Sequence, residues 1–270
     1  MESNTEAKLQ LAPRPQRGYL RQGRETIGLL ITLCSRNQKY ITLGHADIFT
    51  WLLSSFFETY EPDKFNYKFL IGYDDDDEFY IKNHDYLKKR IGESGTITIL
   101  EGCQKNPCKA WNILLQKNCD LADYFYQVGS DIKLLSKGWS SYFVNLLKKN
   151  KNVGICGGVD KQYWLARIIQ NQNGIIENAF FHKTHYEIFG SIFNNEFKTW
   201  FSDDYITRIY MINECCYLSP NILFRNMNRV GQQDYNDRYD PDTKIKDKWL
   251  DIANKDSIKI FNYKKKLILK

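Results

Sequence analysis

The sequence predicts an α/β fold in which helices flank a mostly parallel central sheet. Five short apolar runs, rich in β-branched and aromatic residues, have the length and composition of buried strands. Between them lie segments whose apolar residues recur at helical spacing. Strands and helices that alternate in this way imply βαβ units, and the strands of such units run parallel in one sheet.

The first two predicted strands are each followed by a helix. Ile27–Leu33 is a continuous apolar run, and Asp47–Tyr60 after it has apolar residues at helical spacing. The second strand is Tyr67–Tyr73, and Asn83–Ile91 has the pattern of a short helix. Five consecutive acids, Asp74–Glu78, follow the second strand directly. They therefore come at the edge of the sheet where the parallel strands end.

The third and fourth strands repeat this arrangement. Thr96–Leu100 is a strand of alternating Thr and apolar residues, and Lys109–Gln116 continues a helix whose first turn holds an Asn-Pro pair. Tyr124–Val128 is an aromatic and apolar run that stops at a Gly-Ser-Asp triplet. One carboxylate, that of Asp131, is thus placed where the strand meets a loop, and open α/β sheets bind ligands beyond the carboxyl ends of their strands.

The pattern continues through a fifth strand and then changes. Gly138–Lys149 is predicted to be a helix and Val153–Val159 a strand. Beyond Ile175 we expect a further strand and then a helix that starts near Thr184, with the Thr184 hydroxyl as a candidate N-cap.

Composition separates a central domain from two ends. Residues 1–25 contain few apolar side chains and have the composition of a flexible tail. Residues 233–270 are a basic extension, because the nine Lys and four Asp from Pro241 to Lys270 give +5 of the formal charge of +6. This segment could be a lid, a helix docked on the core, or partly disordered. The domain between them, 26–232, is nearly neutral, which argues against a nucleic-acid partner.

The cysteines and the hydropathy bear on the cellular compartment. The seven cysteines are an odd number without a CxxC pair, so they suit neither a disulfide framework nor a zinc site. They favour a reducing compartment. No apolar run approaches the ~20 residues that a membrane-spanning helix needs, and the N-terminus shows no secretory signal. We therefore expect a cytoplasmic protein without a transmembrane segment.

Three acidic sites each allow two interpretations. The Asp74–Glu78 run is either a solvated loop or, because it ends a strand, a group that contacts a nucleotide. Asp131 is either a turn residue or a ligand of a metal held against a phosphate. Asp203 and Asp204, with Ser202, lie in the first turn of another predicted helix. They either cap that helix or carry chemistry.

The order of these sites resembles that of the GT-A glycosyltransferases, especially the family 2-like enzymes and related ones encoded by large DNA viruses. LLITLCSRN looks like the start of their nucleotide-binding half, YKFLIGYDDDDEFY like its second strand, and PCKAWNILL like a segment that approaches the nucleotide. YFYQVGSDIKLLSKGW resembles the strand with the Asp-x-Asp metal motif, while HKTHYEIFGSIF and WFSDDYITRIY resemble the acceptor side. The resemblance implies a nucleotide-sugar half over 26–132 and an acceptor half over 133–232.

The resemblance also implies a metal-dependent, inverting transfer from a nucleotide-diphosphate sugar, most commonly a UDP-sugar, to an acceptor hydroxyl. Asp131 would bind Mn²⁺ or Mg²⁺, which accept carboxylate and phosphate oxygens. The first acid of the metal motif aligns with Gly129. A second ligand would therefore come from the acidic run after the second strand, or from His182 or His185.

The remaining roles are carried by the same resemblance. Asp204, or failing that Asp203, would be the base that takes the proton of the acceptor hydroxyl. Trp200 and His182 would contact the acceptor, a glycan or glycoprotein. A virus-encoded enzyme of this kind would act in the host cytoplasm. The residues expected around the donor are Thr32, Ser35, Arg36, Asp74, Asp76, Lys109, Asn112 and Ser130.

Two other classes of protein remain as alternatives. A sugar nucleotidyltransferase has a similar nucleotide-binding sheet, but it needs a Gly-rich phosphate-binding loop early in the chain. The corresponding segment here, LCSRNQKY, contains no glycine. A non-enzymatic nucleic-acid or interaction module would suit the pI of about 8.8. It predicts basic residues interleaved with aromatics over the core, whereas the basic excess lies at the C-terminal end.

Overall fold

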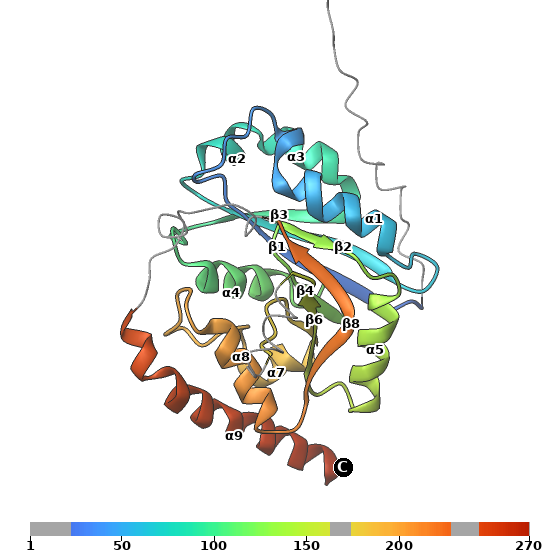
Figure 1. The fold of residues 1–270 in the computed structure, drawn as a ribbon, viewed down its shortest axis with the longest axis vertical. Coiled ribbons are helices and arrows are strands. Elements are labelled where there is room, and N and C mark those ends of the chain that lie inside the picture. Colours follow the sequence, from blue (N-terminus) through green and yellow to red (C-terminus); the bar gives the residue numbers. More distant parts are fainter. Residues whose placement is uncertain (1–22, 163–173, 228–242, 270) are drawn as a thin grey trace, which may run out of the picture.

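The computed structural model (Figure 1) describes residues 23–162, 174–227 and 243–269. The expected tail, 1–25, lies almost wholly outside these residues, as does the start of the expected basic extension. Within the described ranges, none of the helices combines the length and hydropathy that a membrane span requires.

Eight strands of the described residues form one sheet, in the spatial order β3-β2-β1-β4-β7-β6-β8-β5 (Figure 1). Four of the seven neighbouring pairs between these strands are parallel and three are antiparallel. The predicted α/β class with a mostly parallel sheet is therefore confirmed. The strands are β1 (Thr26–Leu33), β2 (Asn66–Asp74), β3 (Gly95–Leu100), β4 (Tyr124–Gln127), β5 (Ile132–Leu134), β6 (Ile155–Asp160), β7 (Phe180–His182) and β8 (Cys216–Asn226).

Each face of the sheet is covered by its own set of helices. Helices η2, α1, α3 and α5 pack on one face, and α4, α8 and α9 pack on the other. The described helices are η1 (Leu43–His45), η2 (Ile48–Leu53), α1 (Ser54–Thr59), α2 (Glu78–Lys82), α3 (His84–Ile91), η3 (Gly92–Ser94), α4 (Pro107–Asn118), α5 (Trp139–Lys149), α7 (Thr184–Phe189), α8 (Ser202–Met211), η4 (Thr243–Asp247) and α9 (Trp249–Ile268).

Strand β1 shows why a continuous apolar run is needed at the centre of this sheet. Ile27, Leu29 and Ile31 belong to the core on one face, and Leu30 belongs to the core on the other. Since alternate side chains point to opposite faces, a strand buried on both sides must be apolar at nearly every position. Gly28 is the exception, because a Cβ there would lie 2.8 Å from Cδ1 of Leu70.

All five strands predicted from apolar runs are present, as β1, β2, β3, β4 and β6. The acidic run after β2 is more than a solvated loop. Asp77 caps α2, because its side chain accepts a hydrogen bond from the backbone N–H of Tyr80. Strands β5 and β8 were not predicted, although β8 is the longest described strand. It contains Ser, Pro and Asn at its centre, so it lacks an apolar run.

The predicted cap of α7 is wrong. Lys183 is the N-cap residue, and the backbone of Thr184 already belongs to the helix. The Thr184 hydroxyl instead donates a hydrogen bond to the carbonyl of Asn152, far away in the sequence. Helix α8 does begin at Ser202 as predicted, but Phe201 is its N-cap residue, with a left-handed φ of 61° and no side-chain hydrogen bond.

The C-terminal residues Trp249–Ile268 form a docked helix, one of the alternatives that the sequence left open. Ala253 and Ile260 of α9 are fully buried in the core that contains α8. Asp256 accepts hydrogen bonds from Tyr205 Oη on α8 at 2.9 Å and from Asn194 Nδ2 at 2.8 Å. These contacts attach the basic extension to the domain.

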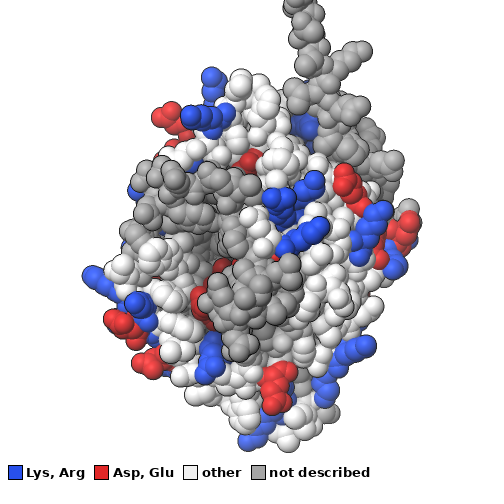
Figure 2. Space-filling view, in the orientation of Figure 1, with Lys and Arg blue, Asp and Glu red and all other residues white. Residues whose placement is uncertain are grey.

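Charge is mixed on the face of the molecule that Figure 2 shows. Figure 2 shows Lys and Arg side chains interspersed with Asp and Glu on the visible face, instead of gathered in one field. This distribution agrees with a nearly neutral core.

Candidate active site

A cavity of about 460 Å³ opens at the edge of the sheet where β1, β2 and β4 end. The start of α4 and the segment that leads into α8 complete its lining. The predicted site residues that line it are Thr32, Arg36, Asp74, Ser130, Asp131, Trp200, Asp203 and Asp204. Parallel strands explain the convergence, because they bring their carboxyl ends to one edge from distant parts of the sequence.

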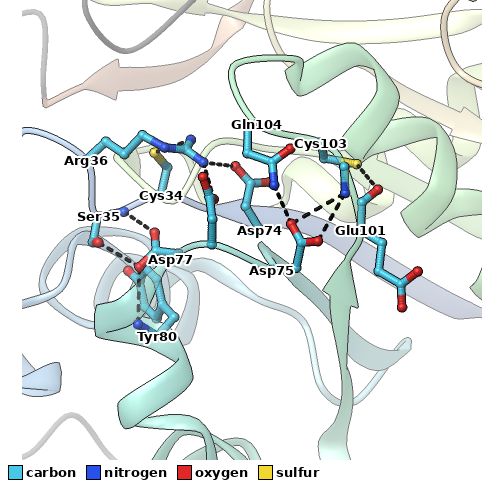
Figure 3. Close-up of polar contacts among 12 residues, drawn as sticks. Cys34, Ser35, Arg36, Asp74, Asp75, Asp77, Tyr80, Glu101, Cys103 and Gln104 are labelled. Carbon is cyan, nitrogen blue, oxygen red and sulfur yellow. Dashed lines mark hydrogen bonds and ion pairs between the residues drawn. The ribbon is translucent and has the colours of Figure 1, made fainter.

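Arg36 and Asp74 line one wall of the cavity, and Figure 3 shows their side chains in contact. Nη2 of Arg36 lies 2.5 Å from Oδ2 of Asp74 and 2.7 Å from Oδ1 of Asp76. Arg36 follows β1 and the two acids follow β2, so the neighbouring parallel strands place these groups together. The wall thus carries one carboxylate and one cation, and Asp76 pairs with the same guanidinium from outside the lining.

The pKa values on this wall reflect burial and pairing. Burial alone would lower the pKa of Arg36, but the hydrogen bonds to Asp74 and Asp76 outweigh burial and raise it. Burial raises the pKa of Asp74, and Arg36 acts against this shift while Asp76 and Asp77 add to it. The carboxylate of Asp74 is therefore held partly desolvated, and its charge is balanced by one guanidinium.

Ser35 faces away from the cavity. Its N–H and Oγ both donate to the carboxylate of Asp77, at 2.7 and 2.6 Å. Figure 3 shows Ser35 directed towards Asp77 and Tyr80, at the start of α2. These bonds attach the loop after β1 to α2. The structure thus gives Ser35 a role in shaping the loop that carries Arg36.

The end of β4 forms the floor of the cavity. Gly129, Ser130 and Asp131 all line it, and Ser130 is buried. A Cβ at Gly129 would lie only 2.5 Å from Oδ1 of Asp131. The carboxylate of Asp131 therefore occupies the space that a side chain at 129 would need. Asn178, which also lines the cavity, accepts a long 3.4 Å hydrogen bond from the N–H of Gly129.

The floor offers oxygen atoms that are suitable ligands for a hard divalent cation. Asp131 supplies a carboxylate, and Ser130 and Asn178 lie beside it in the lining. Mg²⁺ and Mn²⁺ take oxygen ligands, and Mg²⁺ in phosphate sites is bound by one or two carboxylates together with the substrate. Across the ranges that the structure describes, no three His, Cys, Asp or Glu side chains gather into a complete metal site. A cation would thus rely on Asp131 and on the phosphates of a ligand.

The two candidate histidine ligands lie elsewhere in the fold. His182 pairs with Tyr124 at the beginning of β4, whereas Asp131 follows its end. Burial and the neighbouring Lys183 lower the pKa of His182. His185 is fully buried, and its ring nitrogens contact the hydroxyl of Tyr210 and the carbonyl of Ser191. The structure therefore brings neither histidine to Asp131, nor His182 to Trp200.

The opposite wall comes from the segment before α8 and from its first turn. Trp200, Asp203 and Asp204 all line the cavity, and 44% of Trp200 is exposed. The left-handed backbone of Phe201 turns the chain between Trp200 and the helix. Asp203 and Asp204 stand in the first turn of a ten-residue helix, where the helix dipole favours carboxylates. Two acids and one indole thus line the same cavity as Asp131.

Lys109 and Asn112 point away from the cavity lining. Nζ of Lys109 donates to the carbonyl of Gly102 at 2.8 Å. Asn112 is only 4% exposed, and its amide bonds the backbone of Ile192 and Phe193. Asn112 therefore holds the 192–195 segment against α4, and Asp76, paired with Arg36, also lies outside the lining.

Several lining residues were not predicted from the sequence. Gln127, Glu177, Asn178 and Asn226 all line the cavity. Asn226 lies at the end of β8, a strand that the sequence did not predict. Glu177 and Asn178 precede β7, in the segment beyond Ile175 where a strand was expected. The polar Glu-Asn pair between two apolar runs, IIENAFF, is the signal that could have indicated the second of these segments.

The strand order, the helices on both faces of the sheet and the cavity at the ends of β1, β2 and β4 together define a mixed α/β fold of the GT-A type. The chain is similar to solved structures of S. aureus TarS. The 1–349 fragment in complex with UDP matches with 14% identity and a TM-score of 0.50, over 74% of this chain and 59% of that one. The same fragment with UDP-GlcNAc matches with 12% identity and a TM-score of 0.51, over 77% and 62%.

This chain spans about three-fifths of the TarS fragment and 36% of a longer TarS structure. At identities of 10–14% the likeness is one of fold. These bacterial structures give no support to the expected likeness to viral enzymes. No protein-family profile matches the sequence, and a search of curated proteins finds no significant match.

Proposed function

We propose that the protein is a glycosyltransferase that moves a sugar from a nucleotide-diphosphate sugar to an acceptor hydroxyl. The observation that carries this proposal is the cavity itself. It places Arg36 and Asp74 on one wall, Asp131 on the floor, and Asp203 and Asp204 on the other wall. Similar structures of TarS hold UDP and UDP-GlcNAc, which supports a UDP-sugar as the donor.

The wall at the ends of β1 and β2 would bind the nucleoside. Asp74 has a carboxylate at the cavity surface and could accept hydrogen bonds from a ribose or a base. Arg36 fixes the direction of that carboxylate through the 2.5 Å contact. Because the guanidinium is already shared between Asp74 and Asp76, its main contribution is to orient the acids.

The floor would receive the diphosphate. Asp131 would hold Mg²⁺ or Mn²⁺ there, and such a cation supplies Lewis acidity that neutralises the charge on a departing diphosphate. Ser130, whose backbone and hydroxyl lie next to Asp131, could bind a phosphate oxygen. The acceptor side would then lie across the cavity, above the same floor.

The wall at α8 would bind the acceptor and take its proton. Asp204 is the proposed base, and Asp203 is the alternative, because both line the cavity that also contains Asp131. An acceptor hydroxyl that gives its proton to this base attacks the anomeric carbon from the face opposite the departing diphosphate, which predicts inversion at that carbon. The exposed indole of Trp200 offers a flat apolar surface on which a sugar ring could rest.

Donor binding can be tested by thermal unfolding of the full chain. UDP with Mn²⁺ should raise the melting temperature, because a ligand that binds only the folded state stabilises it. Asp131→Asn should remove the part of the shift that depends on Mn²⁺. Asp85→Asn, at an acid in the first turn of α3 outside the cavity lining, is a matched control and should keep the full shift. If no nucleoside diphosphate shifts the melting temperature with any divalent cation, the proposal fails.

The base assignment is tested by separating binding from transfer. Asp204→Asn should reduce transfer by about 10²–10⁴-fold, the usual contribution of a positioned base. The UDP-dependent thermal shift should persist in that variant, since the side chain stands on the wall opposite the donor. If Asp203→Asn abolishes transfer and Asp204→Asn does not, the base is Asp203. If both variants keep full activity, α8 does not supply the base.

A further inference from the structure

Helix α9 covers the domain with one side and leaves the other side uncovered. Its buried side holds Ala253, Asp256, Ser257 and Ile260, and it packs against α8 and α7. Figure 1 shows α9 along the outside of the molecule, with α8 and α7 on its inner side. The fold of the domain therefore accounts for only half of the surface of this 20-residue helix.

The uncovered side is unexpectedly apolar. Leu250, Ile258, Phe261 and Ile268 recur at intervals that keep them on one side of an α-helix. With Leu269, which follows the helix, they are 46–78% exposed. Single exposed apolar residues are common on proteins, but four on one side of one helix make a larger apolar surface, and such surfaces mark interaction sites.

Lysines accompany this apolar surface. Helix α9 carries Lys255, Lys259, Lys264, Lys265 and Lys266, while its only acids are Asp251 and the buried Asp256. Nζ of Lys259 pairs with Asp256, and Lys264 donates to the carbonyl of Asn213. Lys255, Lys265 and Lys266 are exposed and have no ion-pair partner among the described residues. The exposed side of α9 thus combines apolar side chains with lysines, and Lys265 lies on the same side of the helix as Ile258 and Phe261.

We propose that α9 is a membrane-surface helix that attaches the protein to an anionic lipid bilayer. Helices that lie in the interface of a bilayer have this pattern, with Phe and Leu on one side and lysines beside them. Their apolar side chains enter the boundary of the acyl chains, and their lysines reach the negative headgroups. This attachment is independent of the proposed transferase activity, because none of the residues in it lines the cavity.

Two other occupants suit the surface less well. In a two-fold dimer the same surface would face itself, so the lysines of two copies would meet and repel. A nucleic acid would explain the lysines, but it would leave the exposed Leu and Ile side chains unexplained, since bases stack on aromatic side chains and Phe261 is the only aromatic among these apolar residues.

The test is co-sedimentation of the full chain with lipid vesicles, without any sugar nucleotide. The protein should bind vesicles of phosphatidylcholine mixed with phosphatidylserine, bind pure phosphatidylcholine much less, and be released by high salt. The double variant Ile258→Ser, Phe261→Ser should bind at least about tenfold more weakly than the unaltered chain, because it removes two apolar anchors. Lys265→Gln with Lys266→Gln should weaken binding by about tenfold as well.

Two controls keep the outcome unambiguous. Ile41→Ser removes an isoleucine that is 84% exposed outside α9 and should bind like the unaltered chain. The melting temperature of every variant should stay unchanged, because the altered side chains are exposed in the folded protein. Equal binding to both kinds of vesicle, no binding, or unchanged binding of the α9 variants would overturn the proposal. So would a dimer that Phe261→Ser dissociates, or binding of RNA that only the lysine variants lose.

Discussion

Asp131 owes its place in the cavity to the residue two positions before it. Gly129 has no side chain, and the carboxylate of Asp131 lies where a Cβ would be. In the Asp-x-Asp motif that the segment resembles, an acid would stand at this position. The loss of one acid and the position of the other are therefore linked, since the chain cannot hold a side chain at 129 and this conformer of Asp131 together.

Gly129→Ala tests this link directly. The added Cβ would stand 2.5 Å from Oδ1 of Asp131, so the carboxylate must rotate away from the floor. We expect the melting temperature without ligand to change little, because the displaced atoms end a flexible side chain. The Mn²⁺-dependent shift with UDP should fall markedly. Thermal unfolding with and without both ligands measures the two effects, and an undiminished shift would separate Asp131 from the metal.

Helices α8 and α9 are joined by a buried carboxylate as well as by apolar contacts. Asp256 is 4% exposed and accepts hydrogen bonds from Tyr205 and Asn194, and Lys259 pairs with it. Burial alone would raise the pKa of Asp256, but these partners outweigh it and hold the pKa below its usual value. The stability gained from this group is therefore present when the carboxylate is ionised.

Asp256→Asn should lower the stability of the fold by about 1–3 kcal/mol near neutral pH, because the buried network loses its negative charge and one of its two accepting oxygens. A group with a lowered folded pKa adds stability above its unfolded pKa of ~4, and this stability is lost as pH falls through the folded value. The difference between the two proteins should therefore shrink below about pH 4. Denaturant unfolding over a pH series measures it, with exposed Asp251→Asn as the control; a pH-independent difference would contradict the charge argument.

For the whole molecule, the sequence predicts the part of the fold that pairs apolar runs with helices. Strands β1, β2, β4 and β6 follow from apolar runs, which burial on both faces demands. Strand β3, at the edge of the sheet, follows from its alternating Thr and apolar residues. Strand β8 was not predicted because Ser219, Pro220 and Asn221 at its centre interrupt its apolar residues. Its pairing partners, β6 and β5, are far from it in the sequence.

The residues of the candidate site also fall into two groups, those whose position could be predicted from the sequence and those whose role could not. Residues that follow β1, β2 and β4 reach the cavity because the strand ends place them there. Asn112 and Ser35 were assigned to the donor from local resemblance, yet Asn112 bonds the 192–195 segment and Ser35 bonds Asp77. A short polar residue near a strand end can serve a ligand or the backbone equally well, and only the long-range contacts separate these roles.

The C-terminal extension, finally, should behave as part of the domain and not as a removable lid. Deleting residues 243–270 would expose Tyr205 and Ile209 of α8, which now pack in the same core as Ala253 and Ile260. The lost burial and hydrogen bonds would cost on the order of 5 kcal/mol, comparable with the whole stability of a domain. We expect the truncated chain to be insoluble or unfolded by circular dichroism.

Deleting only residues 268–270 removes side chains that are at least 75% exposed where described, and it should leave the melting temperature unchanged. A soluble, cooperatively folded chain that ends at residue 242 would show instead that α9 is an appendage, and that the domain closes its core without it.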